Sequence, residues 1–310
     1  MRLSEVTDEP LYAGTDSEVG DPAALVAEVN GLTHSDLAFV EIAAHGASGG
    51  AIYVRWPDGR DGVLTRSPAT LDRMRQTADV LVSARSRGIP VPRHDLIVEL
   101  ADGSVALVQE RLPGRPPRRV DADVIDLMVA TNERFAGLLV DRPDVPIPPL
   151  HLRESGPQYP RHDVLEGHND RSRRLLRRIR EIGDDDDHEM TGDDLVHPDY
   201  TFGNVLYDEQ RCVTGVVDWN WGAGRGDRHF ALVRIYTDLF WSTLGTGGGE
   251  YGVEQSAFDR LDDVVESMIE PRLLRMYWAH MTLNQLHWAI LYHPPEVVDL
   301  FLRFGESRLG

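Results

Sequence analysis

The sequence predicts an α+β protein with two lobes, a small antiparallel sheet that carries one helix and a larger, mostly helical lobe. Strand-like segments separated by turn residues fill residues 37–110, a Pro- and Gly-rich break follows at 113–117, and helical periodicity dominates the remainder. We therefore expect residues 1–35 to form an N-terminal segment with a short helix, 36–112 the small lobe and 113–310 the large lobe. Two lobes enclose a cleft, which is a favoured position for a ligand site.

The small lobe is expected to contain five strands and one helix. Ahead of it, Asp21 and Gly31 bracket a short helix as its N-cap and its terminator. Apolar or alternating segments bounded by turn residues predict the strands, at 37–42, 51–56, 62–66, 95–100 and 104–110. A helix that ends at Gly88 lies between the third and fourth strands. The apolar residues of its buried face recur at three- and four-residue spacing, and they are Leu71, Met74, Ala78, Leu81 and Val82.

The large lobe is expected to be helical apart from one hairpin over residues 204–218. Pro- and His-rich loops are expected over 142–162. Periodic segments predict the helices, at 124–139, 168–182, 228–244, 254–270 and 272–292.

The composition indicates a soluble protein with enough apolar residues for a core. Of its 310 residues 41% are hydrophobic and 27% are charged, and the formal net charge is −19. A strongly acidic surface repels nucleic acid and anionic membranes, so neither is an expected partner, whereas a cationic small molecule would be attracted. Cys212 is the single cysteine, which excludes an internal disulfide. Because there is no signal-peptide pattern and no apolar run of about 20 residues, we expect a cytoplasmic protein.

The segment His197-Pro198-Asp199 carries the strongest chemical indication, because Asn204 follows at a fixed spacing. Kinase catalytic loops use this H-x-D-x-x-x-x-N arrangement. In such a loop Asp199 would orient the attacking hydroxyl group or accept its proton. Asn204 would offer a neutral oxygen to Mg²⁺.

A second segment, residues 214–217, is an apolar strand that ends at Asp218. Asp218 would be the main carboxylate ligand of the Mg²⁺ that bridges nucleotide phosphates. Asn204 and Asp218 lie at the outer ends of one predicted hairpin, so both side chains can reach the same ions. Either segment alone arises often by chance, but their joint order and the connecting hairpin favour a phosphoryl-transfer site.

Together with a later Gly-Asp pair, these segments resemble the aminoglycoside phosphotransferase family of the protein-kinase-like fold. That family's pattern resembles His-Gly-Asp-x-x-x-x-Asn, a hairpin, Ile-Asp-Trp and Gly-Asp-Pro. This chain has Val-Asp-Trp at 217–219 and Gly-Asp-Arg at 226–228. The resemblance extends over about residues 36–310 and implies a bilobal kinase-like fold, ATP or GTP as co-substrate, and Mg²⁺.

The resemblance also implies a role for each matching residue. Asp199 would be the catalytic base, and Asn204 and Asp218 would bind the metal. His197 would support the loop by hydrogen bonding, and Asp227 is interpreted as structural support.

The chain departs from the family pattern at several positions, which marks it as a divergent member. Pro198 replaces the usual Gly, which stiffens the loop and removes one N–H group. Arg228 replaces the usual Pro, and Ala231 stands where an Asp normally follows. Trp221 is an apparent insertion.

The nucleotide side of the site is expected in the small lobe. Small residues let backbone N–H groups approach phosphate, and those between the first two strands are Ala47, Ser48, Gly49 and Gly50. Arg66 occupies the place of the strand lysine that touches the α- and β-phosphates in the resembled family, and a guanidinium can supply the same donors. The carboxylate that should pair with it is not evident, because Gln76 and Thr77 stand at the expected helix position. The segment that resembles the purine-binding hinge consists of Gln109, Glu110, Arg111 and Leu112.

Two charged segments admit more than one interpretation. Acidic residues concentrated over 184–194 form either a solvated loop or an acidic lip that recruits amines. Arginines crowd one helix between residues 171 and 180. They form either a phosphate-binding patch or a solvated face paired with local acidic residues, and the second interpretation is favoured.

The sequence thus predicts a small-molecule kinase that transfers the γ-phosphoryl group of a nucleoside triphosphate to a hydroxyl group of a small polar acceptor. The acidic charge and the resemblance favour a cationic acceptor, as in antibiotic-resistance phosphotransferases. One alternative is a metabolic kinase for an amino alcohol, a sugar or a nucleoside. A second is a non-catalytic nucleotide-binding protein with a kinase-like fold, and a third is a metal-dependent hydrolase that uses the same Asp, Asn and His residues.

Overall fold

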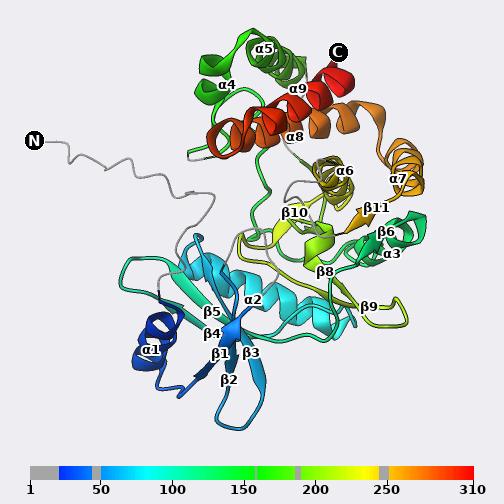
Figure 1. The fold of residues 1–310 in the computed structure, drawn as a ribbon. Helices are drawn as coiled ribbons and strands as arrows, with labels where there is room; N and C mark the ends of the chain where they lie inside the picture. Colours follow the sequence, from blue (N-terminus) through cyan, green and yellow to red (C-terminus); the bar gives the residue numbers. More distant parts are fainter. Residues whose placement is uncertain (1–20, 44–49, 158, 186–189, 244–250) are drawn as a thin grey trace, which may run out of the picture.

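The computed structural model describes residues 21–43, 50–157, 159–185, 190–243 and 251–310. Figure 1 shows a small sheet with two helices in its lower half and a group of helices in its upper half, with short two-stranded ladders between them. The predicted α+β fold class is confirmed. No helix in these ranges is long and apolar enough to cross a membrane.

The small sheet is antiparallel and has the strand order β1-β2-β3-β5-β4. Its strands match the five predicted segments within a few residues, and they are β1 (Ala38–Ile42), β2 (Ile52–Arg55), β3 (Asp61–Ser67), β4 (His94–Glu99) and β5 (Val105–Glu110). In the ladder of β3 and β5, Val63 pairs with Gln109 and Thr65 pairs with Leu107. Because side chains alternate along a strand, these four residues lie on the same face of the sheet.

The two faces of the sheet are covered by different helices. Helix α1 (Pro22–Thr33) packs Val29 against the face that carries Leu64 and Val108. Helix α2 (Leu71–Ser86) packs Met74 against the opposite face, which carries Leu107. Thr65 therefore belongs to the α2 face and Arg66 to the α1 face.

Helix α2 also joins the sheet to the main core. Its second half contributes Val80, Leu81 and Ala84 to the large apolar cluster of the helical part. The expectation that Val82 faces the core is wrong, since its side chain is 60% exposed. The buried stripe follows Thr77 and Val80 instead, because this half of the helix packs on the large lobe and not on the sheet.

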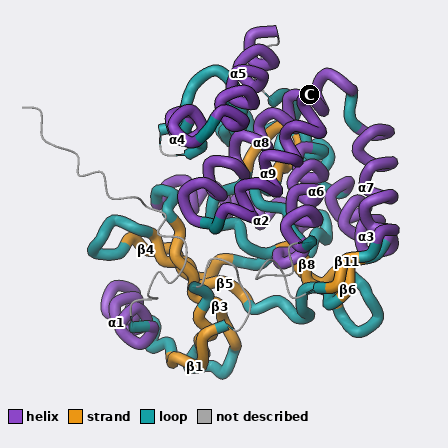
Figure 2. Tube along the Cα trace, turned by 45° about the horizontal axis from the view of Figure 1, so that its top comes forward, coloured by secondary structure: helices purple, strands orange, loops and turns teal. Residues whose placement is uncertain are grey.

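The large lobe is mainly helical, and in Figure 2 its helices gather on one side of the small sheet. Its helices within the described residues are α3 (Ala122–Glu133), α4 (His162–His168), α5 (Asp170–Asp185), α6 (Phe230–Ser242), α7 (Gln255–Met268), α8 (Pro271–Tyr292) and α9 (Pro295–Leu309). Helix α9 was not expected from the sequence. It packs along α8 and buries Val298, Phe301 and Phe304.

The helix expected over residues 124–139 ends early, at Glu133. Beyond it the backbone pairs with the segment before His197: Leu195 donates to the Phe135 carbonyl at 3.1 Å, and Leu139 donates to the Asp193 carbonyl at 2.8 Å. These bonds satisfy groups that a continued helix would have paired internally.

Short two-stranded ladders within the large lobe hold the motif segments. Strands β7 (Asp194–Val196) and β10 (Gly224–Gly226) pair antiparallel, as do β8 (Val205–Tyr207) and β9 (Val213–Val216). Strands β6 (Arg119–Val120) and β11 (Gly252–Val253) pair in parallel. The predicted hairpin over 204–218 is therefore present as β8 and β9.

Candidate functional site

His197 lies directly after β7 and is completely buried. Its Nδ1 accepts the backbone N–H of Asp199 at 3.0 Å, so the ring proton sits on Nε2, which donates to the Val217 carbonyl at 2.9 Å. Burial lowers the pKa of His197 to about 4, so the ring is neutral near pH 7. His197 thus ties the start of the loop to the strand end beside Asp218.

Both carboxylate oxygens of Asp199 have partners. Arg234 of α6 places Nε and Nη2 each 2.9 Å from Oδ1. Asn204 donates from Nδ2 to Oδ2 at 3.2 Å and to the Asp199 carbonyl at 2.8 Å. The carboxylate is therefore held from two sides, by one cationic and one neutral donor.

Asn204 and Asp218 lie close together because the β8–β9 hairpin joins them. Val205 pairs with Val216, and Val217 donates its N–H to the Asn204 carbonyl at 2.9 Å. Asp218 has a φ of 63°, a left-handed conformation that is uncommon for a residue other than glycine. Such strain at the end of a strand is frequent at functional sites.

The electrostatics of this group fit a divalent cation. Burial, with a smaller contribution from the charge of Asp199, raises the pKa of the Asp218 carboxyl to about 6. A bound cation would offset both effects. One carboxylate and one amide oxygen suit Mg²⁺, which prefers oxygen ligands and takes others from phosphate and water. No group of three or more His, Cys, Asp or Glu side chains that could hold an ion occurs among the residues described.

The structure brings Thr65, and not Arg66, to the loop that follows Asp218. Thr65 donates its hydroxyl to Asn220 Oδ1 at 3.0 Å. Arg66 points to the other face of β3, where it pairs with Asp102 and donates to Ser104 at 3.0 Å in the turn between β4 and β5. The predicted contact of Arg66 with phosphate is therefore not supported, because strand alternation turns its side chain away from the cleft.

The four hinge residues differ in their surroundings. Gln109 is 5% exposed and donates from Nε2 to Thr65 at 3.1 Å. Glu110 pairs with Arg85 at 2.8 Å. The Arg111 guanidinium lies 3.7 Å from the centroid of the Tyr53 ring.

Leu112, the last hinge residue, packs over the β8–β9 hairpin. A methyl group on Gly215 would come within 3.0 Å of the side chains of both Leu112 and Leu206. This contact places the hinge beside the strand that follows Asn204. Of the expected phosphate-covering residues, Gly50 lies two positions before the start of β2, whereas Ala47, Ser48 and Gly49 lie outside the described residues.

Asp227 lies among structural contacts in the large lobe. Its Oδ2 accepts the Tyr277 hydroxyl at 2.9 Å, and its Oδ1 accepts the His229 N–H at 2.9 Å. The neighbouring Arg228 makes two bonds to Glu133 and one to Asp194. Arg228 at the usual Pro position is thus explained by these ion pairs.

Sequence reasoning missed Arg234, Asp238 and Asn220. Asp238 lies on α6 with Arg234, and its Oδ2 accepts the Phe202 N–H at 2.9 Å beside the catalytic loop. Burial raises the pKa of the Asp238 carboxyl to about 6. The sequence signal that could have identified Arg234 and Asp238 is their position inside an otherwise apolar helical segment. Charged residues in such a segment are rarely buried without a specific partner.

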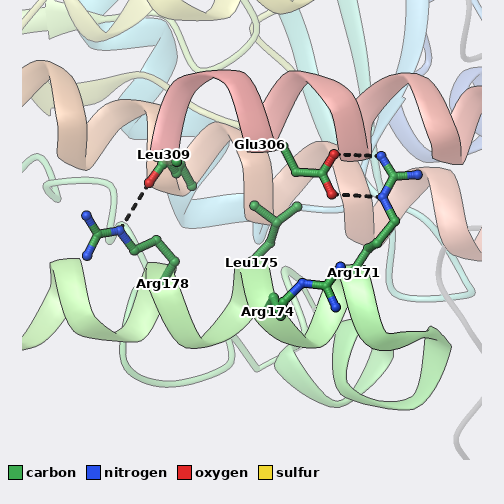
Figure 3. Close-up of a pocket in the computed structure, with 7 residues that line it drawn as sticks. Arg171, Arg174, Leu175, Arg178, Glu306 and Leu309 are labelled. Carbon is green, nitrogen blue, oxygen red and sulfur yellow. Dashed lines mark hydrogen bonds and ion pairs between the residues drawn. The ribbon is translucent and has the colours of Figure 1, made fainter.

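A hollow of about 300 Å³ between α5 and α9 is lined by arginines but does not belong to this group. Figure 3 shows Arg171 bonded to both Glu306 carboxylate oxygens and Arg178 bonded to the Leu309 carbonyl. Arg171 and Arg178 at this hollow are therefore paired with local groups, as the interpretation of a solvated, paired helix face predicts.

Comparison with known families decides what kind of protein carries this geometry. Residues 40–260 match the model of the phosphotransferase enzyme family. The chain belongs to this family. A search of curated proteins gave no match.

Solved structures show how widely the fold of this phosphotransferase is shared. One is a thermostable mutant of the aminoglycoside phosphotransferase APH(4)-Ia in a ternary complex with ADP and hygromycin B, with 16% identity, a TM-score of 0.60, and coverage of 89% of this chain and 93% of that one. A second is an aminoglycoside-3'-phosphotransferase of type VIII, with 21% identity, a TM-score of 0.55, and coverage of 83% and 98%. A third is the amicoumacin kinase hAmiN in complex with AMP-PNP, Ca²⁺ and Ami, with 14% identity, a TM-score of 0.57, and coverage of 93% of both chains. The predicted bilobal kinase-like fold is confirmed.

Proposed function

We propose that this phosphotransferase transfers the γ-phosphoryl group of ATP or GTP to a hydroxyl group of a small polar molecule. The observation that carries the proposal is the joint position of Asp199, Asn204 and Asp218, with Asp199 held on both carboxylate oxygens. The family match supports the reaction class. The nucleotide complexes of the similar structures support a nucleotide donor.

Each residue has a distinct task in this reaction. Asp199 orients the acceptor hydroxyl toward the γ-phosphorus atom and takes its proton as the new O–P bond forms, while the bond from the γ-phosphorus to the β,γ-bridging oxygen breaks and the nucleoside diphosphate leaves. Its carboxylate keeps one orientation because Arg234 and Asn204 hold it, so little reorganisation precedes transfer. Mg²⁺ held by Asn204 and Asp218 would offset the charge that develops on the transferred group.

The acceptor is proposed to be an antibiotic or another cationic metabolite, as for the relatives named for aminoglycosides and amicoumacin. The net charge of −19 supports a cationic ligand. The acidic run over 184–194 supports it less than expected, because Asp184 pairs with Arg153, Asp193 with Arg225 and Asp194 with Arg228. A metabolic kinase for an amino alcohol, a sugar or a nucleoside is the alternative within the same chemistry.

One observation favours a second candidate, a non-catalytic nucleotide-binding protein. The full sequence contains no lysine, since all 32 of its Lys and Arg residues are Arg, and Arg66 points away from the cleft. Kinases use a lysine on the corresponding strand to hold the α- and β-phosphates. Measurable phosphoryl transfer would decide against this candidate.

The test combines binding and turnover. A thermal-shift screen of antibiotics and metabolites with Mg²⁺ and AMP-PNP or GMP-PNP identifies acceptors, because ligands of the folded state raise the melting temperature. Transfer from labelled ATP or GTP to each hit then measures kcat.

We expect Asp199→Ala to lower kcat by orders of magnitude with a small effect on nucleotide affinity, and Asp218→Ala to abolish binding of the Mg²⁺-nucleotide. Asp79→Ala, on the exposed side of α2, is the matched control. Full turnover by both site variants would exclude the proposed roles.

A further inference from the structure

The small lobe presents a hydroxyl group where related kinases present a cation. Lysine from the third strand and a carboxylate from the following helix form an ion pair in protein kinases. Here the β3 residue that faces the loop after Asp218 is Thr65. The acidic residue in the first turn of α2, Asp72, has a side chain that is 95% exposed. The charged pair is therefore missing from both elements within the described residues.

A chain of neutral hydrogen bonds occupies this place. Gln109 of β5 donates to Thr65 of β3 at 3.1 Å, and Thr65 donates to Asn220 Oδ1 at 3.0 Å. The Thr65 hydroxyl thus uses both its acceptor and its donor capacity, which gives the chain one direction. Ser67 on the same face donates to the Asn220 carbonyl at 2.6 Å. Asn220 lies two positions after Asp218, so these bonds fix the short loop that begins at the Asp218 carboxyl group.

Helix α2 fixes the other end of the same loop. Thr77 accepts the Ala223 N–H at 3.1 Å, and Arg73 donates to the Ala223 carbonyl. Gly222 has a φ of 85°, and a methyl group there would lie 2.6 Å from Arg73 Nε, so the helix approaches the loop backbone closely. Arg73 is the cation of α2 in this contact, and its guanidinium is already bound to Gln76 and Ala223.

We propose that Gln109, Thr65 and Asn220 form a neutral positioning chain that holds Asp218 ready for the metal-bound nucleotide, in place of the charged strand–helix pair. The proposal rests on the proposed nucleotide binding of this site. Thr65 is a positioning residue, because it acts on the ligand through Asn220 and Asp218. None of Gln109, Thr65 and Asn220 carries a charge, so compensation of the phosphate charge depends on divalent ions, and nucleotide affinity depends steeply on Mg²⁺.

The test compares Thr65→Val, which removes the hydroxyl at nearly constant shape, with Thr65→Ser, which keeps it. The dissociation constants of AMP-PNP and GMP-PNP are measured by calorimetry over a series of Mg²⁺ concentrations and in EDTA. For Thr65→Val we expect an increase of about 10- to 100-fold with Mg²⁺, since outer partners of metal ligands have effects of this size, and no change in EDTA. Thr65→Ser is expected to stay within about twofold of wild type. Thr33→Val, which removes a hydroxyl on α1 beyond the opposite face of the sheet, is the control.

A second variant keeps the inference testable if Thr65→Val does not fold. Asn220→Ala removes the same hydrogen bond from the loop side. The double variant is expected to lose no more Mg²⁺-dependent nucleotide affinity than either single variant, because both substitutions break the same chain of hydrogen bonds. Equal Mg²⁺-dependent affinity for Thr65→Val and wild type would overturn the positioning chain alone. A loss in Thr65→Ser equal to that in Thr65→Val would do the same. If wild type binds neither nucleotide with Mg²⁺, the proposed function fails together with this inference.

Discussion

Arg234 and Asp199 form a direct ion pair at the centre of the candidate site. Two guanidinium nitrogens of Arg234 lie 2.9 Å from one carboxylate oxygen of Asp199, and a third donates to Thr237 at 2.9 Å. Arg234 is 20% exposed and Asp199 33%, so water screens the pair only in part. The pair holds the carboxylate in one orientation, so that Asp199 can face an acceptor hydroxyl.

Replacing Arg234 should therefore affect the transfer step more than nucleotide binding. In Arg234→Met, Asp199 keeps Asn204 as a partner but loses its cation. We expect kcat to fall about 100-fold while the KM for the nucleotide changes less than threefold, because the bond orients the group that contacts the acceptor. Steady-state kinetics with the acceptor found in the screen measures both values.

Arg303→Met is the matched control for this change. Arg303 lies on α9 in an exposed ion pair with Asp299, and its side chain is 61% exposed. Its loss should leave kcat and KM unchanged. A kcat of Arg234→Met within twofold of wild type would exclude the orienting role.

Replacing Arg66, in contrast, should leave nucleotide affinity nearly unchanged. Its partners Asp102 and Ser104 lie in an exposed turn, and its side chain is on the face of β3 that does not meet Asn220. We expect Arg66→Ala to change the dissociation constant of Mg²⁺–AMP-PNP by less than twofold. A tenfold loss of affinity, measured by calorimetry, would restore the contact with phosphate that the sequence predicts.

The contrast between Arg66 and Thr65 shows what the sequence could and could not predict. The motif with Asp199, Asn204 and Asp218 was recognisable because its members are close in the chain and joined by one hairpin. Thr65 meets Asn220 across 155 positions, so this contact depends on how the lobes pack. A shift of one residue along a strand moves a side chain to the other face of the sheet, and strand limits predicted from sequence can be wrong by more than one residue.

In the large lobe, too, the sequence predicted some helices and missed others. The helices α6, α7 and α8 were predicted because their apolar residues are periodic. Helix α9 was missed because Pro294 and Pro295 mark an end of helix in sequence, although proline is well tolerated in a first turn. The early end of α3 depends on backbone pairing with residues 193–195, which no local pattern contains.

Arg228 provides a prediction for stability. It joins Glu133 and Asp194 through three bonds, and its side chain is 19% exposed. Arg228→Ala removes the cation from two partly buried carboxylates, which keep only His229 at Glu133 and backbone N–H groups at Asp194, so we expect the free energy of unfolding to fall by about 2 kcal/mol. Urea denaturation measures the change, and Arg303→Ala, in its exposed pair, should cost about 0–1 kcal/mol. Equal losses in the two variants would show that the Arg228 pairs add nothing beyond a surface contact.

The last prediction concerns the pH dependence of stability at His280. This residue of α8 is 7% exposed, and its Nδ1 donates to the Leu150 carbonyl at 2.6 Å. Burial, with a smaller contribution from His151, lowers its pKa to about 4, against about 6.5 in the unfolded chain. Between these values the unfolded state binds more protons, so this contribution to stability is complete above pH 6.5 and is lost as the pH falls toward 4.

His280→Asn keeps a donor near the position of Nδ1 but cannot titrate. At pH 7.5 the two proteins differ only by the packing cost of the substitution. Between pH 6.5 and 5 the wild type should lose about 2 kcal/mol more of its free energy of unfolding than the variant, at about 1.4 kcal/mol per pH unit. Urea titrations at pH 7.5, 6.5 and 5 measure this difference. Parallel losses in both proteins would mean that His280 takes up its proton equally in the folded and unfolded states, and its burial would then not keep the ring neutral.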